Sequence, residues 1–136
     1  MSPDPAADLD RLRAIAMALP AAAEKLSHGQ PVFFIEKGKV FAQYWHDHHH
    51  DGASAVMVKT SGIDEQTMLI EADPELYYRP AYIGHSGWIG IRTDRPQTDW
   101  DHIADRIGMS WRLVAPKTLP GPDPNTLGRV IGEQGL

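Results

Sequence analysis

The chain has 136 residues, no cysteine and a formal net charge of −5. This length suits one domain with a single core, and the lack of cysteine excludes disulfides, thiolate metal sites and cysteine nucleophiles. The acidic balance argues against strong nonspecific binding to nucleic acid but leaves a local basic patch open. No apolar run is long enough for a membrane span, and the first residues lack the basic and apolar regions of an export signal. We therefore expect a cytoplasmic protein without membrane contact.

A helix is predicted at the start of the chain. Asp4 and Pro5 are a typical cap and first residue of a helix. Four apolar residues then share one helical face: Leu9, Leu12, Ala16 and Leu19. Pro20 ends this helix, because proline cannot continue the helical hydrogen-bond ladder. Residues 28–31 are expected to form a loop.

Three strands are predicted next. Residues 32–35 and 40–45 are rich in β-branched and aromatic side chains, as strands usually are. Gly38 lies between them, where a tight turn needs a residue with positive φ. Residues 53–59 form a third apolar run. The segment between the second and third strands is rich in histidine.

A second helix and two short strands follow. Ser61 is the expected cap of the helix, with an inner face of Ile63, Thr67 and Ile70. Residues 76–79 are expected to form an edge strand. Residues 87–93 alternate, with Ile89 and Ile91 on one side of the strand and Trp88 and Arg92 on the other.

A third helix begins after Asp99, a suitable cap. Its apolar stripe consists of Trp100, Ile103, Ile107, Trp111 and Val114. Gly108 interrupts that stripe and predicts a kink or break, since glycine costs about 1 kcal/mol relative to alanine inside a helix.

The order of elements is α-β-β-β-α-β-β-α. Helices on one face of a mostly antiparallel sheet make an α+β fold, a two-layer α/β sandwich. One domain is expected over residues 1–117. A tail rich in proline and glycine follows over residues 118–136.

Several motifs match one protein family. Leu19-Pro20 followed by His28-Gly29-Gln30-Pro31-Val32-Phe33 resembles the opening signature of the MmcQ/YjbR family, as does Gly38-Lys39-Val40-Phe41-Ala42. The run from Asp73 to Gly84, followed by Gly87-Trp88-Ile89-Gly90, is similar to the central motif of that family. Asp99-Trp100 and the run from Ser110 to Lys117 resemble its C-terminal helix, where relatives more often carry tyrosine in place of Trp111.

The resemblance covers residues 9–117 and implies a two-layer fold like that of secretion chaperones. It implies no catalytic residue and no settled biochemical activity. Hairpins of the family have been likened to a double-wing surface that binds DNA. A protein-interaction or chaperone-like role is a further alternative, by analogy of fold.

The histidine segment is a candidate metal site. His46, His48 and His50 alternate, so on an extended strand they would share one face. Neutral imidazoles at this spacing can hold a divalent metal such as zinc, nickel or copper. The alternative is a solvated hairpin turn, and no cofactor is predicted beyond such a metal.

A small anionic ligand is another candidate partner. Aromatic side chains with a few convergent polar groups are what small-molecule sites use. The predicted members are His49, Lys59, Tyr82, His85 and Trp88. The alternative is that these aromatic side chains simply pack on the sheet.

Nucleic acid is the candidate partner that the family resemblance favours. Lys37 and Lys39 flank a hairpin tip, where a DNA-binding wing needs cations. Arg92 and Arg95 complete the predicted set if they lie on the same face. The alternative is that lysines at a hairpin tip only keep the protein soluble and block edge pairing.

An enzyme is not expected. Residues 84–87 read Gly-His-Ser-Gly but fail the nucleophile-elbow pattern, because Trp88 stands where that pattern needs glycine. We therefore expect a non-enzymatic domain, as a monomer or homodimer. The first hypothesis for its function is DNA binding through wing-like hairpins.

Overall fold

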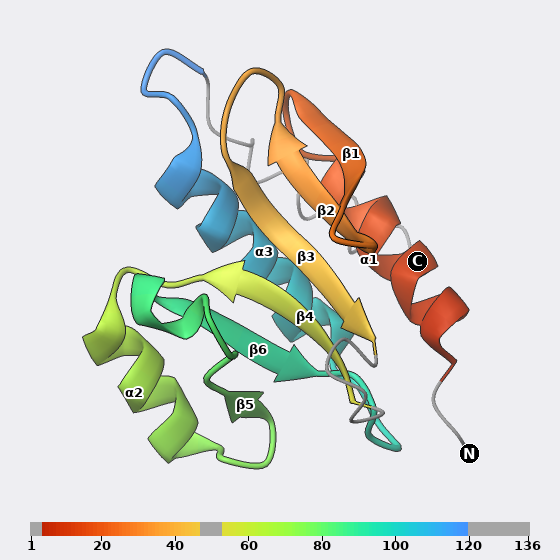
Figure 1. Ribbon diagram of the computed structural model, residues 1–136, viewed down its shortest axis with the longest axis vertical. Coiled ribbons are helices and arrows are strands. Elements are labelled where there is room, and N and C mark those ends of the chain that lie inside the picture. The colour runs from red at the N-terminus through yellow and green to blue at the C-terminus, as the bar shows by residue number, and fades with distance from the viewer. Residues whose placement is uncertain (1–3, 47–52, 120–136) are drawn as a thin grey trace.

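Six antiparallel strands form one sheet in the order β1-β2-β3-β4-β6-β5, and helices pack on it (Figure 1). The computed structural model describes residues 4–46 and 53–119. Its elements in chain order are α1 (Pro5–Met17), β1 (Ala22–Ser27), β2 (Gln30–Ile35), β3 (Val40–His46), β4 (Ser54–Lys59), α2 (Ile63–Ala72), β5 (Tyr77–Tyr78), the 3-10 turn η1 (Gly84–Ser86), β6 (Trp88–Arg92) and α3 (Trp100–Val114). The predicted α+β sandwich is confirmed, with one strand more than expected. In the described part of the chain, no helix is both long and apolar enough to cross a membrane.

The additional strand is β1, an edge strand paired with β2. Its sequence is mainly alanine, glutamate and lysine, which are depleted in strands. The hairpin is recognisable from its two-residue turn. His28 and Gly29 both have positive φ, at 52° and 79°, as a type I′ turn requires. The expected loop over residues 28–31 is therefore shorter, since Gln30 and Pro31 already belong to β2.

The β2–β3 turn uses its glycine differently from the prediction. Lys37, not Gly38, has positive φ, at 62°. A Cβ on Gly38 would lie only 3.1 Å from the Ile35 carbonyl oxygen. Gly38 therefore allows the turn to pass close to the Ile35 carbonyl oxygen. The left-handed conformation is adopted by Lys37 instead.

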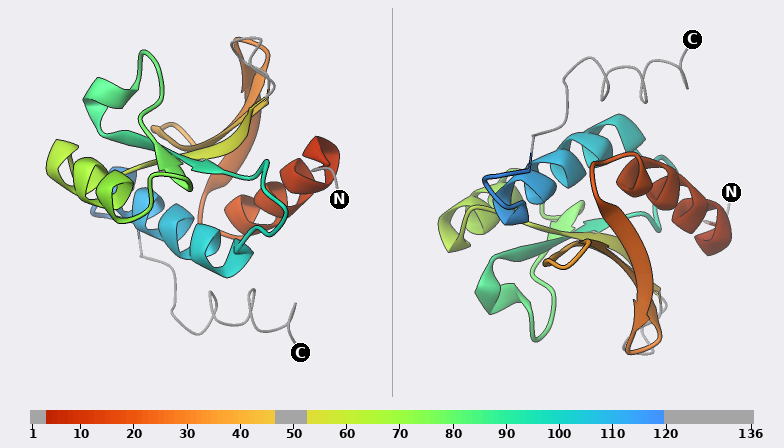
Figure 2. Two further views of the ribbon diagram at one scale, coloured as in Figure 1. Left: turned by 90° about the horizontal axis from the view of Figure 1, so that it is seen from below. Right: turned by 90° about the horizontal axis from the view of Figure 1, so that it is seen from above.

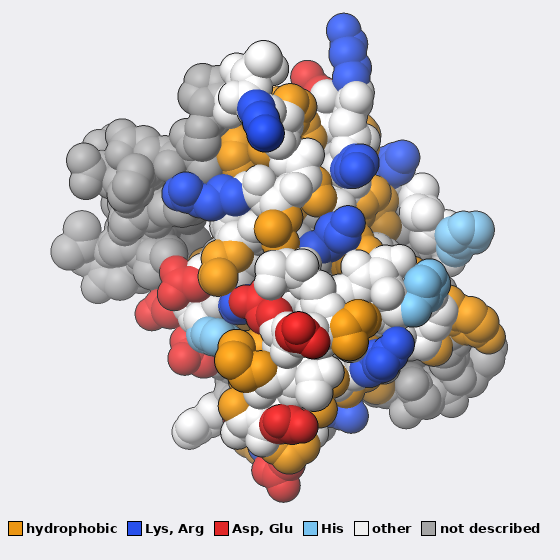
Figure 3. All heavy atoms as spheres, turned by 90° about the vertical axis from the view of Figure 1, so that its left-hand side faces the viewer, with side chains coloured by type: hydrophobic (Ala, Val, Ile, Leu, Met, Phe, Trp, Pro, Cys, Tyr) orange, Lys and Arg blue, Asp and Glu red, His pale blue; other side chains and the backbone are white. Residues whose placement is uncertain are grey.

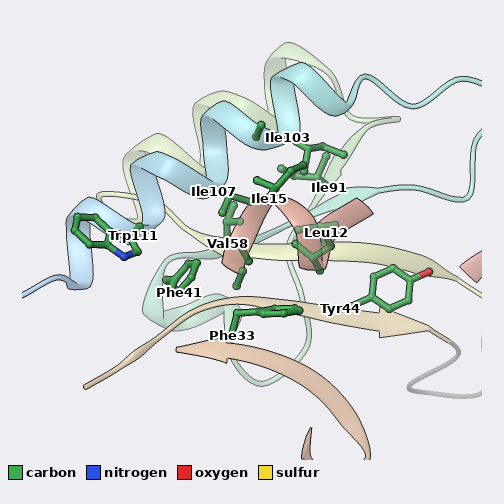
Figure 4. Close-up of a cluster of buried hydrophobic side chains, with 14 of the residues drawn as sticks. Leu12, Ile15, Phe33, Phe41, Tyr44, Val58, Ile91, Ile103, Ile107 and Trp111 are labelled. Atoms are coloured by element: carbon green, nitrogen blue, oxygen red, sulfur yellow. The ribbon is translucent and has the colours of Figure 1, made fainter. Parts of the chain in front are cut away.

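The main core lies between the sheet and the helices α1 and α3. Phe33 and Val58 lie close to Leu12 and Ile15 of α1, and Phe41 lies closer to Trp111 of α3 (Figure 4). The pairing of β2 with β3 shifts register between Phe33 and Phe34, which is a β-bulge. The bulge lets two successive residues of β3, Phe41 and Ala42, join the same core.

Helix α3 supplies the largest part of this core. Ile103, Ile107 and Trp111 are fully buried, and Trp100 and Val114 pack beside them. The predicted stripe is confirmed. The predicted break is wrong, because α3 continues through Gly108, which is itself buried. Packing of the stripe on the sheet outweighs the low helix propensity of one glycine.

The opposite face of the sheet carries a smaller cluster. Trp45, Ala55, Met57 and Trp88 are buried there, with Tyr78 and Ile83 packed against them. Figure 2 shows the segment with η1 standing over this face, away from α1 and α3. The predicted alternation of β6 is confirmed, since Ile89 and Ile91 belong to the main core.

Helix α2 is turned relative to the prediction. Its cap is Gly62 rather than Ser61. Ile70 does pack against the main core, as predicted, but Ile63 and Thr67 are exposed. Gln66 is buried instead, and its Nε2 donates to the carbonyl oxygens of Gly84, at 2.8 Å, and Trp88, at 2.7 Å. A polar residue thus occupies the inner face because it ties α2 to the segment around η1.

Candidate functional site

The four cations predicted for nucleic-acid binding lie at opposite ends of the sheet. Lys37 and Lys39 belong to the β2–β3 turn, whereas Arg92 pairs across the sheet with Ala55, near the far end of β3. At roughly 3.3 Å per residue, Arg92 lies about 20 Å from Lys39 along the strands. Arg92 also stacks on Tyr78, and Arg95 is bound to the backbone and carboxylate of Glu75. One continuous surface of all four is therefore not formed.

Other cations lie near the β2–β3 turn. Lys59 ends β4 beside Phe41 of β3, because Val58 pairs with Ala42. Ser110 of α3 fixes this junction: its hydroxyl donates to the Phe41 carbonyl oxygen at 2.6 Å and accepts from the Lys59 N–H at 2.9 Å. The last turn of α3 and the turn after it add two more cations. We call this set the basic end: Lys37, Lys39, Lys59, Arg112 and Lys117.

The basic end coincides with a separation of charge over the surface. In Figure 3 most Lys and Arg side chains lie over the upper half of the face shown, and most Asp and Glu side chains over the lower half. The β2–β3 turn and the segment that follows α3 are uppermost in the matching orientation of Figure 1. Lys37, Lys39, Lys59 and Lys117 form no ion pair with another described residue. A chain with net charge −5 therefore presents a local positive field.

A cavity of about 270 Å³ opens beside the basic end. It lies between the start of α2 and the second half of α3, with Lys59, Arg106 and Arg112 among its lining residues. Glu65 is the acidic residue in the lining. The Ser61 N–H donates to Glu65 Oε1 at 2.7 Å, and this bond, with Arg106 nearby, holds the pKa of Glu65 below its usual value.

The predicted ligand residues do not converge on this cavity. Lys59 lines it, but Tyr82, His85 and Trp88 do not. Tyr82 is 81% exposed in the segment before η1, and His85 is exposed. Trp88 is buried in the smaller cluster on the face of the sheet opposite α1 and α3. His49 lies outside the described residues.

The predicted metal site is only partly described. His46 ends β3, and its Nδ1 lies 2.7 Å from the hydroxyl of Ser54 on β4. His48 and His50 lie outside the described residues. Within residues 4–46 and 53–119, no three His, Asp or Glu side chains gather in a way that could hold a metal ion.

Sequence reasoning did not find Arg106 and Arg112. Arg106 lies three residues after Ile103 and next to Ile107, so the apolar stripe of α3 already placed it on the border of the buried face. An arginine at such a border is a signal for a buried charge. Arg112 carries no comparable signal, because its neighbours in the cavity come from other parts of the chain.

A group of buried oxygen atoms lies near the end of the sheet opposite the basic end. Asp8 of α1, Tyr44 of β3 and Thr93 after β6 each bury an oxygen that forms no normal hydrogen bond with a described residue. Burial raises the pKa of Asp8, and the nearby Thr93 hydroxyl offsets this only in part. Burial likewise raises the pKa of Tyr44. These contacts make the Asp8 carboxylate a source of instability at neutral pH.

Replacing Asp8 by asparagine is expected to stabilise the domain at pH 7. Because its folded-state pKa is raised, the folded protein binds more protons than the unfolded chain, and stability falls as pH rises through that interval. Asparagine removes the buried charge, so the variant should be more stable only where Asp8 is ionised. The gain in stability should therefore vanish at a pH below 3.8, the ordinary pKa of an aspartate side chain. Thermal unfolding at both pH values measures this. Asp105→Asn, on the exposed surface of α3, is the control, and an equal gain from that variant would contradict the assignment.

Comparisons with known proteins agree with this architecture. Residues 17–113 match the family model described as YjbR. A solved structure, the Deinococcus radiodurans protein DR2400 with a DUF419 domain, is similar with a TM-score of 0.64 and 19% identity, over 88% of this chain and 87% of that one. At this identity the likeness concerns the fold. A search of curated proteins found no match. Since the family model covers most of the sequence, the chain belongs to the YjbR family.

Proposed function

We propose that this domain binds duplex DNA through the basic end. The observation that carries the proposal is the position of Lys37 and Lys39 in the turn between β2 and β3, with Lys59, Arg112 and Lys117 behind it. Because β1 flanks β2 along its whole length, the contact is expected with the phosphate backbone rather than deep in a groove. Cations of the turn and of the residues behind it would contact the phosphates.

The proposal departs from the predicted set of residues. Arg92 and Arg95 are engaged with Tyr78, Asp94 and Glu75 at the other end of the sheet. A duplex bound at the basic end would not reach them. The contact is therefore expected to be small, with five cations at most.

The test is a titration of a labelled duplex by fluorescence anisotropy over a series of salt concentrations. Each neutralised phosphate contributes about 0.9 to the slope of log affinity against log salt. Five cations thus set a limit of about −4.5 for that slope. Lys37→Gln with Lys39→Gln should weaken binding and reduce the slope by about 1.8.

Arg95→Gln is the matched control, because it removes a cation from the opposite end of the sheet. It should leave affinity and slope unchanged. No saturable binding at low salt would refute the proposal. Equal losses from Arg95→Gln and from the lysine pair would also refute it, because the contact would then not lie at the basic end.

A further inference from the structure

The cavity beside the basic end contains a buried cation that is short of acceptors. The Arg106 side chain is 7% exposed, and its Nε and Nη2 have no hydrogen-bond partner among the described residues. Its Nη1 lies 3.5 Å from Glu65 Oε2 and 3.4 Å from the Met109 sulfur, a weak acceptor. A guanidinium stays charged at any physiological pH. Its two unpartnered nitrogen atoms are enclosed in the protein, so Arg106 contributes to the cavity mainly a positive charge that Glu65 compensates in part.

Among the described residues that line the cavity, cations outnumber carboxylates. Three cations in the lining face one carboxylate, and that carboxylate already accepts from the Ser61 N–H and lies near Arg106. Lys59 and Arg112 add positive charge from β4 and from the last turn of α3. An anion entering here would meet two cations besides Arg106.

The remaining wall of the cavity is apolar. Met109 and Leu113 lie four residues apart on α3, so they stand next to each other on its surface. They are 45% and 50% exposed, so both offer apolar surface to the cavity that they line. The cavity thus combines a cationic region with an apolar one.

We propose that this cavity binds a small amphipathic anion, with a carboxylate or phosphate group at Lys59, Arg106 and Arg112 and an apolar body against Met109 and Leu113. Its volume of about 270 Å³ is slightly below the usual range for ligand pockets, about 300–1,000 Å³, so the ligand is small. The site shares Lys59 and Arg112 with the basic end but does not include Lys37 or Lys39, so variants of those two lysines distinguish this proposal from the DNA-binding proposal.

The experiment is calorimetric titration of the full chain with hexanoate, hexyl phosphate, inorganic phosphate and hexanol. Both amphipathic anions should bind at one site, and hexanol and inorganic phosphate at least tenfold more weakly. Arg112→Gln should weaken the binding of both anions about tenfold. Leu113→Gln should weaken hexyl phosphate but leave inorganic phosphate unchanged. Both side chains are exposed, so these variants are expected to fold, which circular dichroism checks.

Lys37→Gln with Lys39→Gln separates this proposal from the previous one. That variant should lose DNA but keep the anions. Absence of saturable binding of hexanoate and hexyl phosphate at millimolar concentration would overturn the inference. Equal affinity for inorganic phosphate and hexyl phosphate would overturn it as well. The site would then recognise the phosphate group alone, as a contact to the DNA backbone does.

Discussion

Replacing Trp111 by alanine is expected to destabilise the domain by about 3–5 kcal/mol, the usual cost of removing a buried tryptophan or phenylalanine. Trp111 is 1% exposed and is among the largest fully buried side chains of the described core. It packs beside Phe41 (Figure 4), and its Nε1 donates to the Pro20 carbonyl oxygen at 3.0 Å. One residue therefore joins α3 to the sheet and to the connection between α1 and β1.

Urea unfolding measures the loss, with a shifted midpoint and an unchanged dependence on urea. Trp111→Tyr is the graded control, because a smaller ring keeps part of the packing. Its expected cost is about 1–3 kcal/mol, typical of a buried group that loses its hydrogen-bond partner. A loss below about 1 kcal/mol for the alanine variant would show that α3 is not held to the sheet through Trp111.

Ser110→Ala is expected to cost about 2–6 kcal/mol, a large effect for so small a change. The alanine variant leaves the Phe41 carbonyl and the Lys59 N–H without the partner that Ser110 supplies, and each buried group without a partner costs about 1–3 kcal/mol. Lys59 belongs both to the basic end and to the cavity. The variant should therefore weaken DNA and anion binding in addition to lowering the free energy of unfolding.

Ser86→Ala provides the matched control, since Ser86 is exposed on η1. It should change neither stability nor binding. Chemical unfolding and the two titrations above measure these effects. If Ser110→Ala unfolds like the unchanged protein, the hydroxyl is not needed to position Lys59, and the connection between α3 and the basic end would be wrong.

Much of the fold follows from local patterns. The helical spacing of Leu9, Leu12 and Ala16, the alternation of Ile89 and Ile91 and the stripe on α3 each report a buried face directly, because burial of apolar side chains decides where those segments lie. The first helix was predicted too long, since α1 ends at Met17, before Leu19. Strand β1 could not be found in this way, since its alanines and charged residues become a strand only by pairing with β2. The orientation of α2 depends on Gln66 and two distant carbonyl groups, which no local pattern contains.

The candidate site was predictable only in part. Lys37 and Lys39 were found because a turn between two strands exposes whatever it carries. Their grouping with Arg92 and Arg95 was wrong, because the register of β3 with β4 and β6 places those arginines at the other end. Arg106 and Arg112 join Lys59 only through the packing of α3 across the sheet. Such a meeting of distant segments is a property of the tertiary structure.

The division of the core into two clusters has a spectroscopic consequence. Trp100 and Trp111 belong to the layer between the sheet and the helices, and Trp45 and Trp88 to the cluster on the opposite face. The tryptophan fluorescence of the domain is therefore the sum of two pairs of indole groups. Each pair responds to changes on its own face of the sheet. A disturbance confined to one layer changes only half of the emitting groups. Two optical signals that do not coincide during unfolding would then mean that the layers separate from the sheet at different stages.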